Sequence, residues 1–302
     1  MAEGRRYQVW DVFTDRKLAG NPLAIVLDAD GLETDDMLRI ANEFNLSETT
    51  FVLPPDQAAH RARVRIFTPF YEMPFAGHPT VGTAIAIAAR DGLSDSVFVL
   101  EEKVGPVRCA VSSEAGVAFA EFDLPKLPAA APFDVSREAA AAALDLSPDE
   151  VGFENHRVSA WDAGVPYVTI PVRDLGSAGR ARLDPRLWLE ITGGATEAKA
   201  PAAYVYCRQT VGHGNAFHAR MFAGHVGLTE DPATGSAAAA FAGAVMRFDE
   251  PVDGESRHWI EQGVEMGRPS RIHLELLVET GTLKRARIGG NAVMVMEGLL
   301  HA

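Results

Sequence analysis

The sequence contains only two cysteines among its 302 residues, Cys109 and Cys207, and each falls in an alternating, strand-like run. The first residues lead directly into a strand-like segment and lack the apolar core of a signal peptide. Without an export signal, we expect reduced thiols rather than a disulfide, and a cytoplasmic protein.

The chain also lacks long apolar runs and an excess of positive charge. Its uncharged helical runs extend over about ten residues, whereas a helix that spans a membrane needs about 20. Lysine and arginine number 28 against 41 aspartates and glutamates, which gives a net charge of −13. Because no basic stripe is present to neutralise phosphates, we expect neither a nucleic-acid partner nor a membrane partner.

What the chain does contain is one segment that occurs twice. The first copy reads Glu-Met-Pro-Phe-Ala-Gly-His at residues 72–78, and the second reads Glu-Asp-Pro-Ala-Thr-Gly-Ser at residues 230–236. Similar strand-like lead-ins precede the copies, at residues 65–67 and 220–222. A spacing of 158 residues between the copies is too long for a solenoid repeat, so we expect two related halves.

Each glycine turn is followed by a run without charge on any face, at residues 80–89 and 237–246. Such runs predict helices that are buried on all sides, one at the centre of each half. Pro79 suits the first turn of the first helix, and Thr234 or Ser236 could cap the second.

The start of a buried helix is also a potential anion site. Its first NH groups have no partner within the helix, and its dipole places partial positive charge there. Two such starts, at Gly77 and Gly235, would hold a small carboxylate if they face one another. The alternative is that the glycines only form turns, but polar residues at matching places favour binding: His78 in one copy, Asp231 and Ser236 in the other.

Glu48 falls where a predicted helix gives way to a strand, among uncharged neighbours from residue 45 to residue 52. Partial desolvation of a carboxyl at such a place would suit general acid/base catalysis. The alternative is a solvated loop glutamate, and the spacing alone leaves both open.

Three histidines fall close together, His213, His218 and His225, but no Cys, Asp or Glu accompanies them at metal-ligand spacing. The Gly-His-Gly sequence at residues 212–214 also lacks the further glycines and the following helix of a phosphate loop. We therefore expect neither a metal site nor a phosphate loop in this segment.

The remaining patterns predict mostly antiparallel sheet. Residues 97–124 alternate as a meander, and residues 125–132 carry three prolines in eight positions, which makes them the best linker candidate. Residues 19–22 predict a turn. Residues 283–296 predict a last hairpin, whose closing strand could return to the first half.

Five segments together resemble the PhzF family of phenazine-biosynthesis isomerases, and the resemblance runs from about Tyr7 to Gly298. The segments are Gly20-Asn21-Pro22, Ser47-Glu48-Thr49, Gly-His-Pro-Thr at residues 77–80, Glu-Asp-Pro-Ala-Thr-Gly-Ser-Ala at residues 230–237, and Gln-Gly-Val-Glu-Met-Gly-Arg-Pro-Ser at residues 262–270. One departure is Gly224-His225, where a proline is expected in relatives.

The resemblance implies an α/β fold like that of diaminopimelate epimerase. Such a fold has two pseudo-symmetric domains, each a mostly antiparallel sheet around a buried central helix, with the active site between them. We expect an N-terminal domain of residues 1–127 with 288–302 and a C-terminal domain of residues 128–287. The family also implies a cytoplasmic homodimer that needs no metal or cofactor.

The implied activity is a cofactor-independent isomerisation that moves a proton and a double bond in a small cyclic carboxylate, such as trans-2,3-dihydro-3-hydroxyanthranilate. By resemblance, Glu48 is the catalytic acid/base, and His78 and Asp231 are polar groups of the same site. The substrate-binding residues implied are Gly77, Gly235, Ser236, Asn21 and Ser47.

Two alternatives to this activity stay open. One is an isomerase or epimerase acting on a different small carboxylate, and the other is a silent relative that binds a small molecule without reaction. The intact set of Glu48, His78, Asp231 and Ser236 argues against the silent relative. A two-thiol racemase is disfavoured because both cysteines fall away from the glycine turns.

Overall fold

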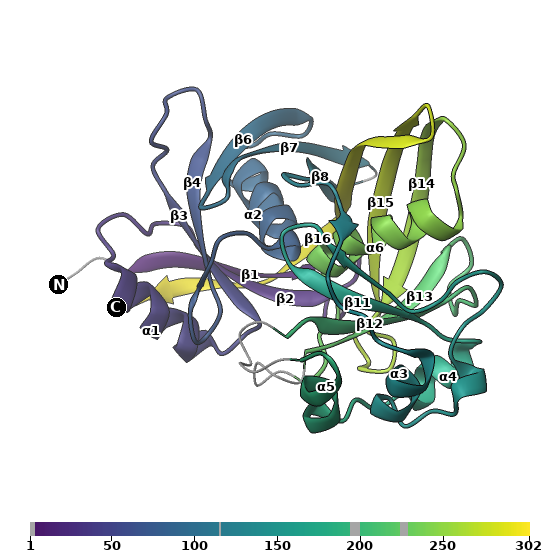
Figure 1. Cartoon of the computed structure of the whole chain (residues 1–302). Helices are drawn as coiled ribbons and strands as arrows, with labels where there is room; N and C mark the ends of the chain where they lie inside the picture. The colour runs from purple at the N-terminus through teal and green to yellow at the C-terminus, as the bar shows by residue number, and fades with distance from the viewer. Residues whose placement is uncertain (1–3, 115, 194–199, 224–228) are drawn as a thin grey trace. The chain divides into compact units, whose positions relative to one another are not determined.

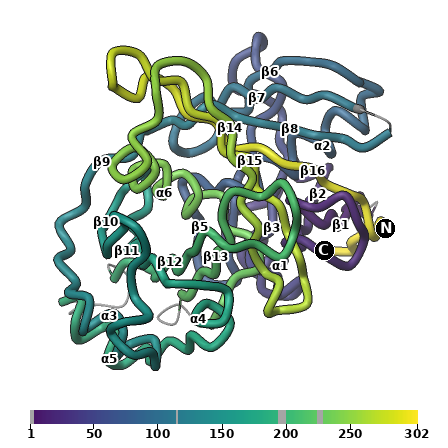
Figure 2. Tube along the Cα trace, turned by 90° about the vertical axis from the view of Figure 1, so that its right-hand side faces the viewer, coloured from purple at the N-terminus to yellow at the C-terminus, as the bar shows by residue number. Residues whose placement is uncertain are grey.

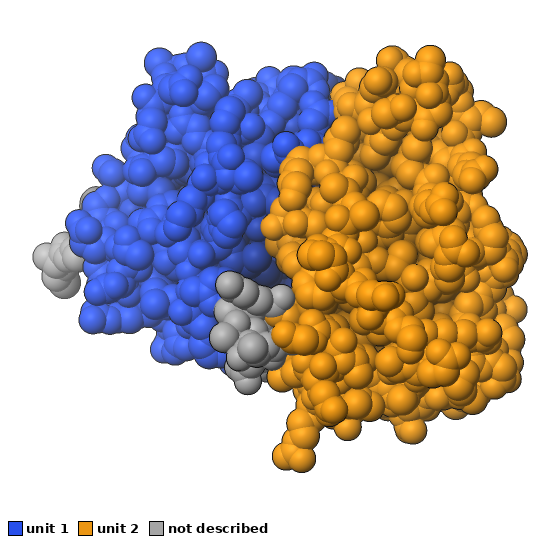
Figure 3. All heavy atoms as spheres, in the orientation of Figure 1, with its two compact units in different colours: residues 1–125, 288–302 blue, residues 126–287 orange. Residues whose placement is uncertain are grey.

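A computed structural model describes residues 4–114, 116–193, 200–223 and 229–302. The chain forms two compact units, coloured separately in Figure 3: unit 1 is residues 1–125 with 288–302, and unit 2 is residues 126–287. No helix among the described residues is both long enough and apolar enough to cross a membrane.

Unit 1 is a closed barrel of eight strands with a helix inside it (Figure 1). Its elements are β1 (Arg5–Val12), β2 (Asn21–Val26), α1 (Thr34–Phe44), β3 (Glu48–Leu53), β4 (Ala62–Phe67), β5 (Glu72–Met73), α2 (Gly77–Arg90), β6 (Ser96–Glu102), β7 (Gly105–Glu114), β8 (Val117–Asp123) and the end of β16 (Thr282–Leu300). The strands pair in the order β1-β2-β3-β4-β6-β7-β8-β16, and β16 closes the ring on β1. The short β5 pairs with β4.

The helix inside this barrel is α2, and its sequence explains its place. Residues 77–88 are all buried, and the helix carries no charge before Arg90. Gly82 lets it approach the barrel wall, because a Cβ added there would lie 2.7 Å from side-chain carbons of Val12 and Leu23. The predicted buried helix is therefore confirmed for the first half.

Unit 2 repeats the arrangement of a sheet with a buried helix. Its elements are β9 (Ala129–Ala130), α3 (Arg137–Ala143), the 3-10 turn η1 (Pro148–Glu150), β10 (Ser159–Asp162), β11 (Pro166–Pro171), α4 (Leu175–Arg180), α5 (Pro185–Ile191), β12 (Ala202–Cys207), β13 (Phe217–Phe222), α6 (Gly235–Phe248), β14 (Gly254–Gln262) and β15 (Ser270–Glu279), which turns into β16. The strands pair in the order β16-β15-β14-β13-β12-β11-β10-β9.

The buried helix of unit 2 is α6, which contacts β9, β10, β11 and β15. The short helices α3, α4 and α5 lie together away from α6, as both views of the chain show (Figures 1 and 2). A separate apolar cluster fills the space beneath them, with Trp188 of α5 buried in it. The second buried helix is thus also confirmed.

The packing of α6 depends on a glycine at its middle. A Cβ added at Gly243 would lie 2.3 Å from Cε3 of Trp161 on β10. We expect Gly243→Ala to lower the free energy of unfolding by about 1–3 kcal/mol, because the ring would have to move in a close-packed core. Urea denaturation measures this loss. The matched control is Gly179→Ala in α4, where nothing lies closer than 4.0 Å and stability should not fall.

The two copies of the repeated segment share an ion pair as well as a helix start. In unit 1, Nε of Arg65 donates to Oε1 of Glu72 at 2.7 Å. In unit 2, Arg220 binds both carboxylate oxygens of Glu230 at 2.8 Å. The Arg and Glu that match between the copies therefore tie each lead-in strand to the loop that follows it.

The structure corrects three local predictions. Asn21 and Pro22 are not in a turn but begin β2, opposite Val12 and Asp11 of β1, and proline is tolerated at such a strand start. Residues 283–296 are not a hairpin, because β16 is one strand; the turn lies before it, between β15 and β16. Thr234 is the N-cap residue of α6, but its hydroxyl does not cap the helix. The predicted return of the last strand to the first half is confirmed by its pairing with β1.

Candidate functional site

The first candidate region is the Glu48 cluster, which we define as Asn21, Glu48 and His78 of unit 1. Nδ1 of His78 lies 3.5 Å from Oε2 of Glu48 and 3.4 Å from Nδ2 of Asn21. The side chains of His78 and Glu48 are 5% and 16% exposed, so the glutamate is largely desolvated but still accessible. Glu48 is therefore not the solvated loop residue of the alternative interpretation.

Strand register brings this cluster together. β2 and β3 run parallel with Leu23 opposite Glu48, so the starts of both strands lie at the same edge. Glu48 is the first residue of β3, and Ser47 just before it is half-buried. His78 comes from the first turn of α2, inside the barrel.

His78 is neutral at physiological pH, because complete burial lowers its pKa to about 3. Its Nε2 is buried and has no hydrogen-bond partner among the described residues. A neutral imidazole brings no positive charge to Glu48, and a buried nitrogen of this kind can hydrogen-bond to a ligand.

Tyr71 is a neighbour of the cluster that the sequence reasoning missed. Its pKa is raised by burial and, to a lesser extent, by the charge of Glu48. Tyr71 is 49% exposed. It lies in a loop in which the Thr68 hydroxyl accepts hydrogen bonds from the backbone NH groups of Tyr71 and Phe70. The only hint in the sequence was a pair of aromatic residues just before the glycine turn.

The second candidate region is the Asp231 loop, which we define as residues 230–236 of unit 2. Asp231 is 5% exposed, and one of its carboxylate oxygens accepts a hydrogen bond from the hydroxyl of Thr234. Gln262 supports the loop from β14: its Nε2 donates to the backbone oxygen of Asp231 at 2.8 Å and to the Thr234 hydroxyl at 3.1 Å. The carboxylate is thus held in a fixed orientation.

The start of α6 completes this loop. Gly235 is the first residue of the helix and is buried, so its NH group is one of those without a partner inside the helix. The hydroxyl of Ser236 lies 2.7 Å from the hydroxyl of Tyr167 on β11. Tyr167, Thr234 and Gln262 are three polar residues of this region to which the sequence reasoning gave no role in the site. Thr234 was considered only as a helix cap, and Gln262 only as part of a segment that carries the family resemblance.

The motif at residues 262–270 serves to hold the Asp231 loop. Beside the contacts of Gln262, the hydroxyl of Ser270 donates to the backbone oxygen of Pro232 at 3.1 Å. Gly263 has a φ of +75°, and a Cβ there would lie 2.5 Å from the backbone oxygens of both Pro232 and Arg268. Only glycine fits at this point.

We expect Gly263→Ala to destabilise unit 2 by about 1–3 kcal/mol, because backbone oxygens cannot move aside as a side chain can. Denaturant unfolding followed by tryptophan fluorescence measures the loss. Gly267→Ala is the matched control from the same motif, since Gly267 has a φ of +70° but nothing within 4 Å of an added Cβ. Equal losses in both variants would show that the φ angle alone matters.

Of the three histidines considered as metal ligands, His218 has other partners. His218 lies between two carboxylates, with Nδ1 2.8 Å from Glu261 and Nε2 2.9 Å from Glu265. Among the described residues, no group of three His, Cys, Asp or Glu side chains is arranged to hold a metal ion. His225 and the departure at Gly224-His225 lie outside the described residues.

Both cysteines are free, buried and distant in sequence from the two glycine turns. Burial is the main cause that raises the pKa of Cys109 far above its usual value and that of Cys207 to about 12. Neither thiol is therefore ionised at neutral pH. A two-thiol racemase would require an ionised thiol, because the thiolate is the reactive form.

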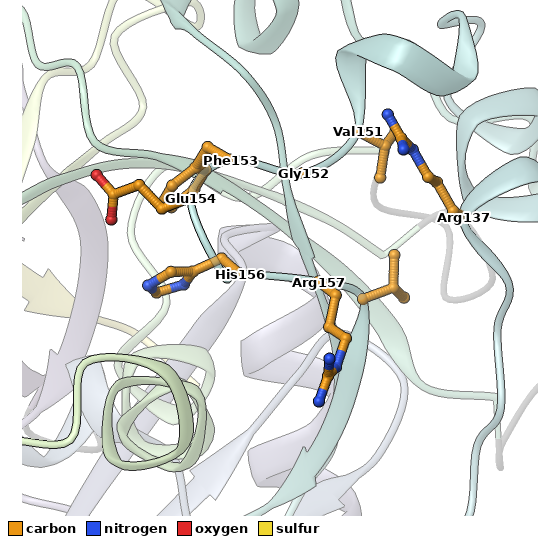
Figure 4. A pocket seen from close by; sticks show the side chains of 8 residues that line it. Arg137, Val151, Gly152, Phe153, Glu154, His156 and Arg157 are labelled. Carbon is orange, nitrogen blue, oxygen red and sulfur yellow. The ribbon is translucent and has the colours of Figure 1, made fainter.

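Unit 2 also has a surface cavity of about 320 Å³, shown in Figure 4, with Arg137 and Arg157 among its lining residues. The guanidinium groups point apart in this view. Arg137 donates to the backbone oxygen of Pro148, and Arg157 lies over the ring of Phe248. The cavity includes no residue of the repeated segments.

Comparison with known proteins identifies relatives over the whole chain. The family model described as phenazine biosynthesis-like protein matches residues 10–298. An uncharacterized isomerase of Mesorhizobium japonicum is 62% identical, with 98% of each chain covered. The trans-2,3-dihydro-3-hydroxyanthranilate isomerase of Pseudomonas aeruginosa is 35% identical over 97% of this chain and 98% of its own.

Solved structures show the same fold. A PhzF-family phenazine biosynthesis protein of Bacillus anthracis superposes with a TM-score of 0.89 at 28% identity, covering 99% of this chain and 100% of its own. A hydroxyproline epimerase of Agrobacterium vitis superposes with a TM-score of 0.65 at 12% identity, over 99% of this chain and 93% of its own, which is a likeness of fold alone.

A barrel closed around a buried helix in unit 1, and a sheet with a second buried helix in unit 2, define the diaminopimelate epimerase-like fold. The relatives named as isomerases place the chain in that class of enzymes. Within that class, the chain belongs to the PhzF family.

Proposed function

We propose that this protein is a cofactor-independent isomerase that moves a proton, and with it a double bond, in a small cyclic carboxylate. The substrate that its relatives favour is trans-2,3-dihydro-3-hydroxyanthranilate, the compound named for the isomerase of Pseudomonas aeruginosa that is 35% identical. The observation that carries the proposal is the Glu48 cluster, in which a desolvated carboxylate lies beside a neutral histidine.

Glu48 acts as the base that removes a proton from an acidified ring carbon, and then as the acid that returns it to another carbon. The double bond shifts between the two steps, so substrate and product are isomers. A buried but accessible carboxylate suits this exchange, because the proton that it takes up is not lost at once to bulk water.

His78 orients the substrate rather than taking the proton. Because its imidazole is neutral, it offers one nitrogen to a hydroxyl or amine of the ring without neutralising Glu48. Asn21 also contacts Nδ1 of His78 and so contributes to the cluster. Ser47 and the NH group of Gly77 are donors for the substrate at the start of β3 and of α2.

The Asp231 loop binds the polar groups of the substrate. The NH group of Gly235 and the hydroxyl of Ser236 stand at the positive end of α6, which favours a carboxylate. The carboxylate of Asp231, which is held by the hydrogen bond from the Thr234 hydroxyl, accepts a hydrogen bond from a ring amine or hydroxyl of the substrate. Each interaction is of the charge-assisted kind, worth about 1.5–3 kcal/mol.

A second candidate function is the isomerisation or epimerisation of a different small carboxylate. The M. japonicum relative, at 62% identity, is named only as an uncharacterized isomerase, so its name favours the reaction class and not a substrate.

The test is to incubate the purified protein with trans-2,3-dihydro-3-hydroxyanthranilate and to follow the ring protons by NMR. Conversion to an isomer supports both the reaction class and the substrate. If the spectrum stays unchanged while other cyclic carboxylates are isomerised, the substrate is wrong and the reaction class stands. If none reacts, a binding protein without catalysis is the better description.

A further inference from the structure

Glu102, the last residue of β6, is a buried carboxyl that the proposed reaction does not use. It is 7% exposed, and its Oε2 has no hydrogen-bond partner among the described residues. Its Oε1 lies 2.8 Å from the hydroxyl oxygen of Thr80, in the first turns of α2. The carboxyl of Glu102 therefore contacts the N-terminal part of α2, the helix that begins with Gly77 and His78.

The number of hydrogens at Thr80 indicates the protonation state of this carboxyl. The Thr80 hydroxyl oxygen has two close oxygen neighbours, Glu102 at 2.8 Å and the backbone oxygen of Ala76 at 2.7 Å. A hydroxyl has one hydrogen, and a backbone oxygen can only accept. With an ionised Glu102, one of the two contacts would bring oxygens together without a hydrogen between them.

A neutral Glu102 satisfies both contacts. Its OH group donates to Thr80, and Thr80 donates to the backbone oxygen of Ala76, the N-cap residue of α2. The unpartnered Oε2 is then a neutral carbonyl oxygen, which costs much less to bury than half of a carboxylate charge. This chain of hydrogen bonds ends directly before Gly77.

The surroundings keep the carboxyl neutral. Burial is the main cause that raises the pKa of Glu102 to about 8, and its contact with Thr80 only partly offsets it. Two of the titratable groups on the elements packed around it are His78 of α2, which is neutral, and Cys109 of β7, whose own pKa is raised. The charge of Asp123 on β8 raises the pKa of Cys109, and the charge of Arg108 on β7 lowers it.

We propose that Glu102 is a positioning residue that works as a neutral acid, holding the start of α2 through Thr80 and Ala76 so that Gly77 and His78 are correctly placed. As far as it concerns catalysis, this inference rests on the proposed isomerase function. Loss of the Glu102 proton removes the donor to Thr80 and loosens the helix start, so activity falls in alkaline solution.

The first measurement is NMR of protein labelled with carbon-13 at the glutamate carboxyls, which needs no substrate. One resonance should titrate near pH 8 and should be missing from Glu102→Gln. The backbone amide signals of Gly77 and His78 should shift with the same midpoint in the wild type and stay constant in the variant. A Glu102 resonance that titrates near pH 4.5 would overturn the proposal.

The second measurement is the pH profile of kcat. Glutamine keeps a neutral donor for Thr80 but cannot ionise, so Glu102→Gln should keep kcat within about threefold of the wild type at pH 7 and lose the decline around pH 8. Glu102→Ala has no donor and should lower kcat at least tenfold at every pH. A Glu102→Gln profile that declines at the same pH as the wild type would contradict a role for this proton.

Thermal unfolding provides a control that is independent of activity. Between about pH 4.5 and pH 8 the folded protein holds a proton that the unfolded chain releases, so the wild-type Tm should fall as pH rises through this window. Glu102→Gln should lack this part of the decline. If the wild type turns over no substrate, the proposed function fails, and the NMR titration together with this Tm dependence still decides the protonation of Glu102.

Discussion

Glu48→Gln is expected to reduce kcat by about 10²- to 10⁴-fold, the range that general acid/base catalysis typically contributes. Glutamine has nearly the same shape and can still contact Nδ1 of His78, so the fold and substrate binding should be retained. The loss should therefore fall on kcat, with KM changed by only a few fold. Steady-state kinetics under saturating substrate measures it.

The matched control is Glu43→Gln, which removes one carboxylate from the exposed surface of α1, five residues earlier in the chain. It should behave as the wild type. If Glu48→Gln keeps more than a tenth of wild-type kcat, Glu48 is not the base, and another group must move the proton.

Asp231→Asn is expected to reduce kcat/KM by about 10- to 100-fold. The asparagine oxygen can still accept the hydrogen bond from Thr234, so the loop should keep its conformation, but the charge that binds a ring amine or hydroxyl is lost. A hydrogen bond to a charged group is worth about 1.5–3 kcal/mol, and each 1.4 kcal/mol corresponds to a factor of ten.

Two companion measurements separate binding from folding in this variant. Its Tm should stay close to that of the wild type, and Thr234→Ser, which keeps the hydroxyl beside Asp231, should retain most activity. A loss in the free energy of unfolding comparable to that of Gly263→Ala would mean that Asp231 only supports the loop.

The sequence predicted those parts of the fold that rest on local pattern. Runs without charge identified α2 and α6 as buried helices, because a helix with no polar face has to be covered on all sides. The repeated segment identified the two helix starts. The return of β16 to the first half was anticipated because the last strand has no partner in the local order, and because the last strand returns to the first domain in the fold that the sequence resembles.

Other features depend on contacts that no local pattern contains. Asn21 looked like a turn residue, yet β-pairing places it in β2, where its side-chain nitrogen lies 3.4 Å from Nδ1 of His78. The link from Gln262 to the Asp231 loop joins residues 31 apart in sequence. Glu102 lies in a strand whose sequence looks ordinary, and only the contact of its carboxyl with the Thr80 hydroxyl distinguishes it.

The repeat itself was found from the sequence, but the sequence did not show why the same arginine and glutamate occur in both copies. Arg65 with Glu72 and Arg220 with Glu230 are ion pairs that hold each loop to its strand, so these glutamates are structural. Within the repeated segments, the side chains proposed for the site are those that differ between the copies, namely His78, Asp231 and Ser236.

The measurement that tests the central claim most directly is isomerisation in heavy water, with trans-2,3-dihydro-3-hydroxyanthranilate as substrate and proton NMR as the readout. The account predicts that wild-type protein forms the isomer with deuterium at the carbon that receives the proton, and that Glu48→Gln forms none over the same time. Deuterium incorporation that continues at the wild-type rate in Glu48→Gln would contradict it.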